Sequence, residues 1–298
     1  MNRRLARKWY DGIDRAKEIL DISKERDLTL EEIEELKTLH TGYGGLTSFK
    51  SDQFFTPEVV TSFLVDMVDP KDGWNVLEFS CGCGAFLNAL TQKNSNINLT
   101  GIELSYDLAQ IASLCYPKAN IIRGDALDYL AEFEGRMNLV ISNPPFGMPT
   151  VRKNFEVARR ASEQYFLEMA VRCLKPGGVV ALILPEGIFC NSHTKPLRKW
   201  LMEKCYYLGT ISLPIQTFYF AGTGVKTSIM LAKKKYPGHE AGNYPVFMAI
   251  CEEVGWDNRG KPTGKCDLDK IREAYFELKP EQDAYLENSK TEFDVINF

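Results

Sequence analysis

Residues 76–86 of this 298-residue chain are Val76-Leu-Glu-Phe-Ser-Cys-Gly-Cys-Gly-Ala-Phe86. An apolar segment with the length of a buried strand leads directly into a turn containing Gly82 and Gly84, and an apolar helical pattern follows. Glycine permits a tight turn and a close approach of the backbone to a ligand. The segment therefore predicts a strand–turn–helix unit of an α/β fold, with a turn that is either ligand-binding or purely structural.

Similar units follow toward the C-terminus. Apolar segments alternate with amphipathic helical stretches through the first five predicted strands, which indicates a mostly parallel sheet with helices on both faces. Two further strands flank a glycine-containing segment and indicate an antiparallel pair at one edge. The predicted strands are Asn75–Phe79, Leu99–Glu103, Asn120–Arg123, Leu139–Ser142, Val179–Pro185, Leu208–Leu213 and Ser228–Ala232. We therefore expect a Rossmann-like, mostly parallel, seven-stranded sheet with a C-terminal antiparallel strand pair.

Acidic residues stand at or just after the ends of the second and third predicted strands. Glu103 can accept hydrogen bonds from both hydroxyls of a ribose, and the alternative is a solvated carboxylate. Asp125 can accept a hydrogen bond from an adenine amino group, cap the following helix, or do both. No GxGxxG sequence accompanies the glycine turn, so we expect a nucleoside without pyrophosphate, which favours S-adenosylmethionine over NAD.

The segment Leu139-Val-Ile-Ser-Asn-Pro-Pro-Phe146 ends the fourth predicted strand and is the most informative for chemistry. Proline cannot donate a hydrogen bond, so the segment presents two acceptors, the Asn143 side-chain oxygen and the Pro144 carbonyl. Two acceptors suit a planar NH₂ group, and Phe146 offers an aromatic face on which a base can stack. The alternative is a rigid turn with a core phenylalanine.

Asn143-Pro-Pro-Phe146 resembles the catalytic motif of amino-methyltransferases, in the form that DNA adenine methyltransferases favour. Cys81-Gly-Cys-Gly84 is similar to their cofactor loop, with Glu78 in the acidic position. Gln53-Phe-Phe-Thr-Pro57 resembles a segment of the modification subunits of type I restriction systems. The resemblance extends from about Gln53 to Lys235 and includes Leu213-Pro-Ile-Gln-Thr-Phe218.

The resemblance implies a site-specific adenine-N6 DNA methyltransferase of a restriction-modification or mobile-element system. It implies transfer from S-adenosylmethionine to an adenine flipped out of the duplex, directly and without a metal. The implied catalytic residues are Asn143, Pro144, Pro145 and Phe146. The implied cofactor-binding residues are Phe55, Thr56, Pro57, Glu78, Ser80, Gly82, Gly84, Phe86, Glu103, Leu104, Asp125, Ala126 and Asn143.

Net charge is mild evidence against DNA binding, because the chain has 36 basic and 40 acidic side chains and a formal charge of −4. Two basic clusters follow the catalytic motif. Arg152, Lys153, Arg159 and Arg160 are candidates for phosphate contacts, whereas Lys195, Arg198 and Lys199 are better explained as a solvated helix face. Since no full target-recognition domain is evident, we expect weak DNA binding in isolation. A specificity subunit or a recognition domain in trans, a recognition domain elsewhere in a longer parent protein, or relaxed specificity would each explain its absence.

Three segments are predicted. Residues 1–46 form a helical segment, in which Thr29 and Glu32 predict a capping box and the segment Thr41–Leu46 stops the second helix. Residues 47–235 form the catalytic domain, and residues 236–298 form a polar C-terminal extension. No apolar run is long enough to span a membrane, and the cysteines and histidines lack metal-ligand spacing. We expect a cytoplasmic protein without a metal.

Three alternatives remain open on the sequence. Some ribosomal RNA enzymes that methylate a base amino group also carry an NPPF motif. Protein glutamine methyltransferases are less consistent with the sequence, because they usually have Tyr where this chain has Phe146. A non-catalytic methyltransferase-like component of a larger complex would bind the cofactor without transferring its methyl group.

Overall fold

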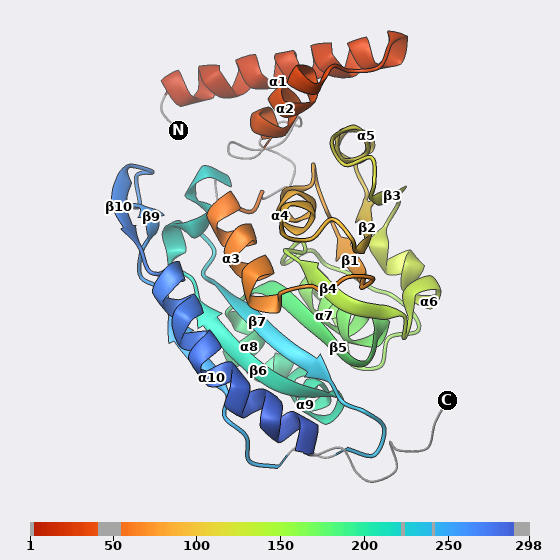
Figure 1. The fold of residues 1–298 in the computed structure, drawn as a ribbon, viewed down its shortest axis with the longest axis vertical. Coiled ribbons are helices and arrows are strands. Elements are labelled where there is room, and N and C mark those ends of the chain that lie inside the picture. The colour runs from red at the N-terminus through yellow and green to blue at the C-terminus, as the bar shows by residue number, and fades with distance from the viewer. Residues whose placement is uncertain (1–2, 41–54, 222–223, 240–241, 289–298) are drawn as a thin grey trace.

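A single eight-stranded sheet organises the molecule, with helices on both of its faces (Figure 1). The structure is a computed structural model that describes residues 3–40, 55–221, 224–239 and 242–288. The strand order is β3-β2-β1-β4-β5-β7-β6-β8. These strands are β1 (Asn75–Phe79), β2 (Asn98–Glu103), β3 (Asn120–Arg123), β4 (Met137–Ser142), β5 (Leu174–Pro185), β6 (Cys205–Ser212), β7 (Thr227–Lys234) and β8 (Phe247–Ile250). A separate hairpin consists of β9 (Val254–Trp256) and β10 (Pro262–Cys266).

Helices and helical turns fill the connections between the strands. The α-helices are α1 (Arg3–Glu25), α2 (Leu30–His40), α3 (Glu58–Val68), α4 (Ala85–Lys93), α5 (Tyr106–Cys115), α6 (Leu130–Phe133), α7 (Ser162–Cys173), α8 (Gly187–Cys190), α9 (Lys195–Lys204) and α10 (Leu268–Asn288). The 3₁₀ segments are η1 (Ala126–Tyr129), η2 (Ser192–Thr194) and η3 (Ile215–Ala221).

Both faces of the central strands are buried, as a parallel sheet between helical layers requires. In β5, Ala181 and Ile183 face the cluster that includes α3, α4, α5 and α10. Leu182 and Leu184 alternate with them and face the cluster that includes α6, α7 and α9. Neighbouring strands β2, β1, β4 and β5 pair in parallel, so their carboxyl ends meet at one edge of the sheet. The α/β prediction and its strand positions are confirmed.

The sheet differs from the prediction at its far side. β7 pairs antiparallel with β6, as predicted, but it lies between β5 and β6. β8 then pairs in parallel with β6 and adds an eighth strand from the segment predicted to be a polar extension. The sequence of β8 gives little sign of its strand character, because Met248 and Ile250 are apolar yet 76% and 72% exposed. The sequence of β8 therefore lacks the alternation of apolar and polar residues by which a half-buried strand is recognised.

The N-terminal segment forms the two predicted helices, α1 and α2. The capping box is confirmed, since the Glu32 carboxylate accepts from the Thr29 amide at 2.8 Å and the Thr29 hydroxyl accepts from the Glu32 amide at 3.2 Å. Leu36 of α2 is fully buried. The predicted helix stop at Thr41–Leu46, Gln53 of the resembling segment, and the boundary between residues 46 and 47 lie outside the described residues.

Two features are absent from the described part of the chain. None of its helices is long and apolar enough to cross a membrane. Within the same residues, no group of three or more His, Cys, Asp and Glu side chains is arranged to hold a metal ion.

Candidate active site

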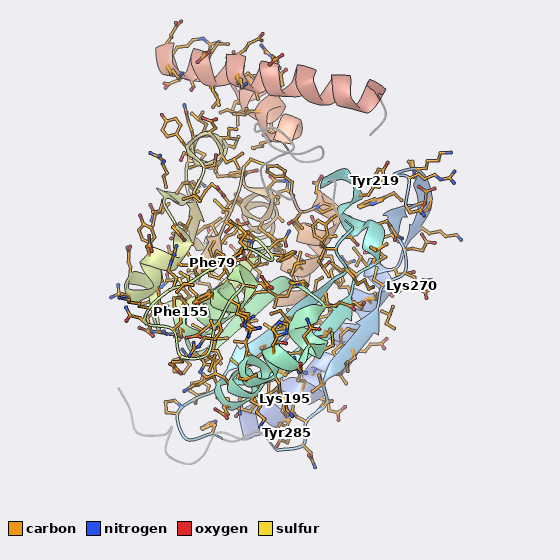
Figure 2. The ribbon with its side chains drawn as sticks, turned by 180° about the vertical axis from the view of Figure 1, so that it is seen from behind. Phe79, Phe155, Lys195, Tyr219, Lys270 and Tyr285 are labelled. Atoms are coloured by element: carbon orange, nitrogen blue, oxygen red, sulfur yellow. The ribbon has the colours of Figure 1, made fainter. Side chains whose placement is uncertain are left out.

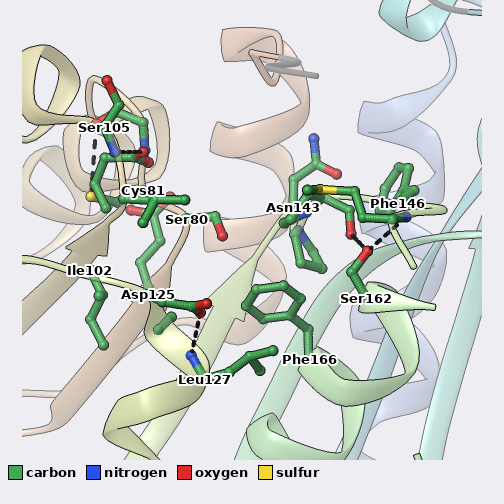
Figure 3. A pocket seen from close by; sticks show the side chains of 18 of the residues that line it. Ser80, Cys81, Ile102, Ser105, Asp125, Leu127, Asn143, Phe146, Ser162 and Phe166 are labelled. Carbon is green, nitrogen blue, oxygen red and sulfur yellow. Dashed lines mark hydrogen bonds between the residues drawn. The ribbon is translucent and has the colours of Figure 1, made fainter. Parts of the chain in front are cut away.

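A cavity of about 560 Å³ opens at the carboxyl ends of β1, β2 and β4. Its volume lies within the range of about 300–1,000 Å³ that is usual for small-molecule sites. The loops after β1, β2, β3 and β4 and the N-terminal half of α7 form its wall, so residues far apart in the sequence meet there. Figure 3 shows Asp125 on one side of this cavity and Asn143 with Phe146 on the other, with Phe166 of α7 between them.

Glu103 closes the end of β2 and holds the glycine turn. One carboxylate oxygen accepts from the Gly82 amide at 2.8 Å, and the other accepts from the Ser105 amide at 2.8 Å. The side chain is largely buried, and this burial raises the pKa of Glu103. Gly82 has φ +58°, a conformation that side chains rarely adopt. Each carboxylate oxygen retains a lone pair for a ligand in the cavity.

Glu78 lies deeper, one residue before the carboxyl end of β1. It is 2% exposed, and its Oε2 atom has no hydrogen-bond partner among the described residues. Burial raises the pKa of Glu78 well above its ordinary value, and the nearby charge of Glu103 adds to this effect. A raised pKa favours the protonated form, in which the carboxyl group can donate a hydrogen bond into the cavity.

Asp125 makes two contacts in the structure. Its carboxylate accepts from the Leu127 amide at 3.1 Å, so the predicted helix cap is confirmed. Its other oxygen forms an ion pair with Arg152, from the loop that follows Asn143–Phe146. Arg152 therefore lines the cavity, and its guanidinium pairs with Asp125 while 35% of its side chain stays exposed.

The motif Asn143–Phe146 is fixed from three directions. The Ser142 hydroxyl donates to the Phe79 carbonyl and ties the end of β4 to β1. The Asn143 side-chain amide donates from Nδ2 to the Thr56 hydroxyl at 3.1 Å. The Ser162 hydroxyl donates to the Pro145 carbonyl at 2.8 Å (Figure 3). Oδ1 of Asn143 is buried and has no partner in the described part of the chain, so it is an acceptor available to a ligand.

Most of the predicted site residues line this one cavity. They are Phe55, Thr56, Glu78, Ser80, Gly82, Phe86, Glu103, Leu104, Asp125, Ala126, Asn143, Pro144, Pro145 and Phe146. Pro57 and Gly84 do not line it. Pro57 instead precedes α3 as its N-cap residue. Gly84 has φ +100°, and a Cβ atom there would lie 2.3 Å from the Tyr116 ring, so packing requires this glycine.

The predicted basic residues differ in their surroundings. Lys153, Arg159 and Arg160 are exposed on the loop between the motif and α7. Arg159 also donates to the carbonyls of Ala158 and Glu156 within that loop. In the second cluster, Arg198 donates to the Ile188 and Asn191 carbonyls, which gives it a structural role at the end of α8.

The cavity is also lined by residues that the sequence analysis did not indicate. They are Cys81, Ala85, Ile102, Ser105, Leu108, Gly124, Leu127, Met148, Pro149, Thr150, Val151, Ser162 and Phe166. Residues in this group that neighbour a predicted site residue in the sequence line the cavity because they belong to the same loops. Ser162 and Phe166 belong to α7, and no local signal could place that helix beside the motif.

The model of the N-6 DNA methylase family matches residues 43–295 of this chain. The chain belongs to the N-6 DNA methylase family. The methylase subunit of the type I restriction enzyme EcoEI from Escherichia coli is 26% identical over 64% of the chain and 44% of that protein. The modification methylase CviBIII of Paramecium bursaria Chlorella virus NC1A is 27% identical over 68% of the chain and 54% of that protein. The chain thus spans about half the length of these relatives.

Solved structures share the fold. A protein from Listeria monocytogenes, assigned to the class I S-adenosylmethionine-dependent methyltransferases, superposes with a TM-score of 0.64 and 17% identity. The superposition covers 92% of this chain and 100% of that one. These comparisons confirm the predicted family and the methyltransferase fold. They also confirm the predicted cofactor, S-adenosylmethionine.

The candidate site fits such a cofactor. The cavity has the size of a small-molecule site, and two buried polar atoms, Glu78 Oε2 and Asn143 Oδ1, have no partner among the described residues. Carboxylates at the ends of β2 and β3 suit the hydroxyl and amino groups of a nucleoside.

Proposed function

We propose that this chain transfers a methyl group from S-adenosylmethionine to the N6 amino group of adenine in DNA. The observation that carries the proposal is the buried Oδ1 of Asn143, which has no hydrogen-bond partner among the described residues and belongs to a side chain that lines a cavity with acidic side chains on its other side. An amino group is the natural partner for such an acceptor. Membership of the N-6 DNA methylase family supports the choice of substrate.

Glu103, Asp125 and Glu78 would hold the cofactor, together with the Gly82 turn. The bound cofactor supplies an electrophilic methyl group on a sulfonium. The carboxylate of Glu103 accepts from the ribose hydroxyls, and that of Asp125 accepts from the adenine amino group of the cofactor. Asp125 must then share its carboxylate between this ligand, the Leu127 amide and Arg152.

The catalytic motif acts by position and polarity. The amino group of adenine is a poor nucleophile, because its lone pair is delocalised into the ring. Asn143 Oδ1 and the Pro144 carbonyl accept its two hydrogens and draw the nitrogen toward tetrahedral geometry, so that the lone pair localises. Pro145 keeps this backbone rigid. Phe146, which is half-buried at the cavity, stacks on the base and offsets part of the few kcal/mol that flipping it out of the duplex costs.

DNA recognition requires more than this cavity. Lys153, Arg159 and Arg160 are exposed beside the motif and would contact phosphates. We do not assign this role to Arg152, because it pairs with Asp125. A recognition domain or a specificity subunit in trans would supply sequence selectivity, since the similar EcoEI protein is one subunit of a type I restriction enzyme.

The test is transfer of labelled methyl from S-adenosylmethionine to unmethylated genomic DNA, with total RNA in parallel. We expect N6-methyladenine in DNA, and no transfer by Asn143→Ala, which should still bind the cofactor. Label in RNA alone would replace the DNA assignment with an RNA one. Cofactor binding without transfer to either would support the non-catalytic alternative, and full activity of Asn143→Ala would refute the catalytic role of the motif.

A further inference from the structure

The β9–β10 hairpin protrudes beside the segment that follows β6. Figures 1 and 2 show it next to η3, with Tyr219 of η3 facing it, on the side of the sheet where the strands β4 and β6 end. Trp256 of β9 donates from its indole nitrogen to the Gln216 carbonyl at 2.7 Å. Gln216 in turn donates to the Glu252 carbonyl at 3.2 Å. The hairpin is therefore braced against the same edge of the sheet at which the candidate active site opens.

Two carboxylates of the hairpin accept hydrogen bonds from the backbone, Asp257 in its turn and Asp267 directly after β10. Asp257 accepts from the amides of Arg259 and Lys261 at 2.8 and 2.9 Å, which lowers the pKa of Asp257 and closes the turn. Asp267 accepts from the amides of Glu252 and Glu253 at 2.9 and 2.8 Å at the base of the hairpin. These two carboxylates stabilise the conformation of the hairpin.

The cations of the hairpin, in contrast, extend into solvent. Arg259, Lys261 and Lys265 are all exposed, and none of them forms an ion pair with another described residue. On the helices, several surface cations are instead paired, such as Arg272 with Asp66 at 2.9 Å. From β9 to β10 these three cations outnumber the single carboxylate, Asp257, whereas Glu252, Glu253 and Asp267 lie at the base of the hairpin. The tip of the hairpin is therefore locally positive on a chain whose formal net charge is −4.

We propose that the basic surface of the β9–β10 hairpin, formed by Arg259, Lys261 and Lys265, contacts the phosphate backbone of the DNA whose adenine enters the cavity. An acidic protein can hold a polyanion only where cations are gathered locally, and a duplex presents regularly spaced phosphates to such a surface. These contacts would position the duplex without reading its sequence. The inference rests on the proposed function, since it requires a DNA substrate.

The test compares two variants with the same change of charge. In the first, Arg259→Gln, Lys261→Gln and Lys265→Gln are combined. In the matched control, Lys118→Gln, Lys175→Gln and Lys204→Gln are combined, three exposed lysines just before or at the amino ends of β3, β5 and β6, at the opposite edge of the sheet. Affinity for a fluorescent duplex is measured by anisotropy over a range of salt concentrations. Calorimetric binding of S-adenosylmethionine checks that each variant is folded.

We expect the hairpin variant to bind duplex DNA more weakly, whatever the DNA sequence. The slope of log K against log salt should become less steep by about 3, roughly one for each phosphate that the hairpin no longer neutralises. The control should keep the wild-type slope. Equal slopes for the two variants, with wild-type DNA methylation intact, would overturn the inference and leave the proposed function standing. Absence of DNA methylation and DNA binding in the wild type would instead refute the proposed function.

Discussion

The side-chain amide of Asn143 is held by a single described hydrogen bond, from Nδ2 to the Thr56 hydroxyl. This bond fixes the orientation of the amide, because Nδ2 is the atom that contacts Thr56 and Oδ1 is left without a partner among the described residues. Thr56 is itself buried and lines the cavity, and it comes from the segment before α3, far from β4 in the sequence. Its role is therefore to position Asn143, in addition to any contact with the cofactor.

Replacing Thr56 with valine should slow methyl transfer at saturating cofactor. Valine has a similar shape but cannot accept a hydrogen bond, so the Asn143 amide loses an interaction worth ~1 kcal/mol, about a fivefold change in rate. Single-turnover transfer to duplex DNA measures this effect. Thr56→Ser should restore most of the rate, and Thr61→Val, which removes another buried hydroxyl in α3, should not reproduce the loss. A loss confined to cofactor affinity would contradict the positioning role.

At the scale of elements, helix α7 holds the loop that follows the catalytic motif. Glu168, which is fully buried, accepts from the amides of Glu156, Val157 and Ala158. Ser162 binds the beginning of the same loop through the Pro145 carbonyl. One helix thus fixes both ends of the loop, and the shape of the cavity wall follows from its position.

Glu168→Gln should destabilise the protein by about 2 kcal/mol, because the amide can accept with only one oxygen and leaves buried backbone amides without a partner. Urea unfolding followed by circular dichroism measures this loss. Glu203→Gln makes the same chemical change at an exposed position of α9 and should leave stability within about 0.5 kcal/mol of the wild type. Similar stabilities for the two variants would show that Glu168 does not hold the loop.

At the scale of the whole molecule, the C-terminal helix α10 closes one face of the sheet. Tyr275 is 3% exposed and packs edge-on against Phe247 of β8, with ring centroids 5.3 Å apart. Gln282 donates to the carbonyls of Leu208 and Pro245, and Arg272 pairs with Asp66 of α3. Residues late in the chain are therefore part of the hydrophobic core.

Tyr275→Ala should lower the free energy of unfolding by about 3–5 kcal/mol, the usual loss when a buried aromatic side chain is truncated. The neighbouring Phe276→Ala is the matched control, because Phe276 is 40% exposed and its removal opens less of the core. Chemical denaturation of both variants gives the comparison. If Tyr275→Ala cost no more than Phe276→Ala, the packing of α10 on the sheet would be refuted.

Local sequence patterns were sufficient to predict the parallel half of the sheet and the residues at its carboxyl edge. Apolar segments of strand length predict the strand positions, and the motifs at Glu103, Asp125 and Asn143 lie at the ends of strands or directly after them. Because parallel strands end at one edge, these three residues were expected to lie close together. Most of the other predicted residues that line the cavity came from the family resemblance.

Only the tertiary structure decided what surrounds those residues. It placed Ser162 and Phe166 in the cavity wall, turned Arg152 inward to Asp125, and gave Gly84 a packing role against Tyr116. It also added β8 and α10 to the core from a segment without a clear pattern. The physical reason for this division is the sequence separation over which the interactions act. Hydrophobic periodicity and turns are local properties of the chain, whereas ion pairs, ring packing and edge-strand pairing depend on partners that only folding brings together.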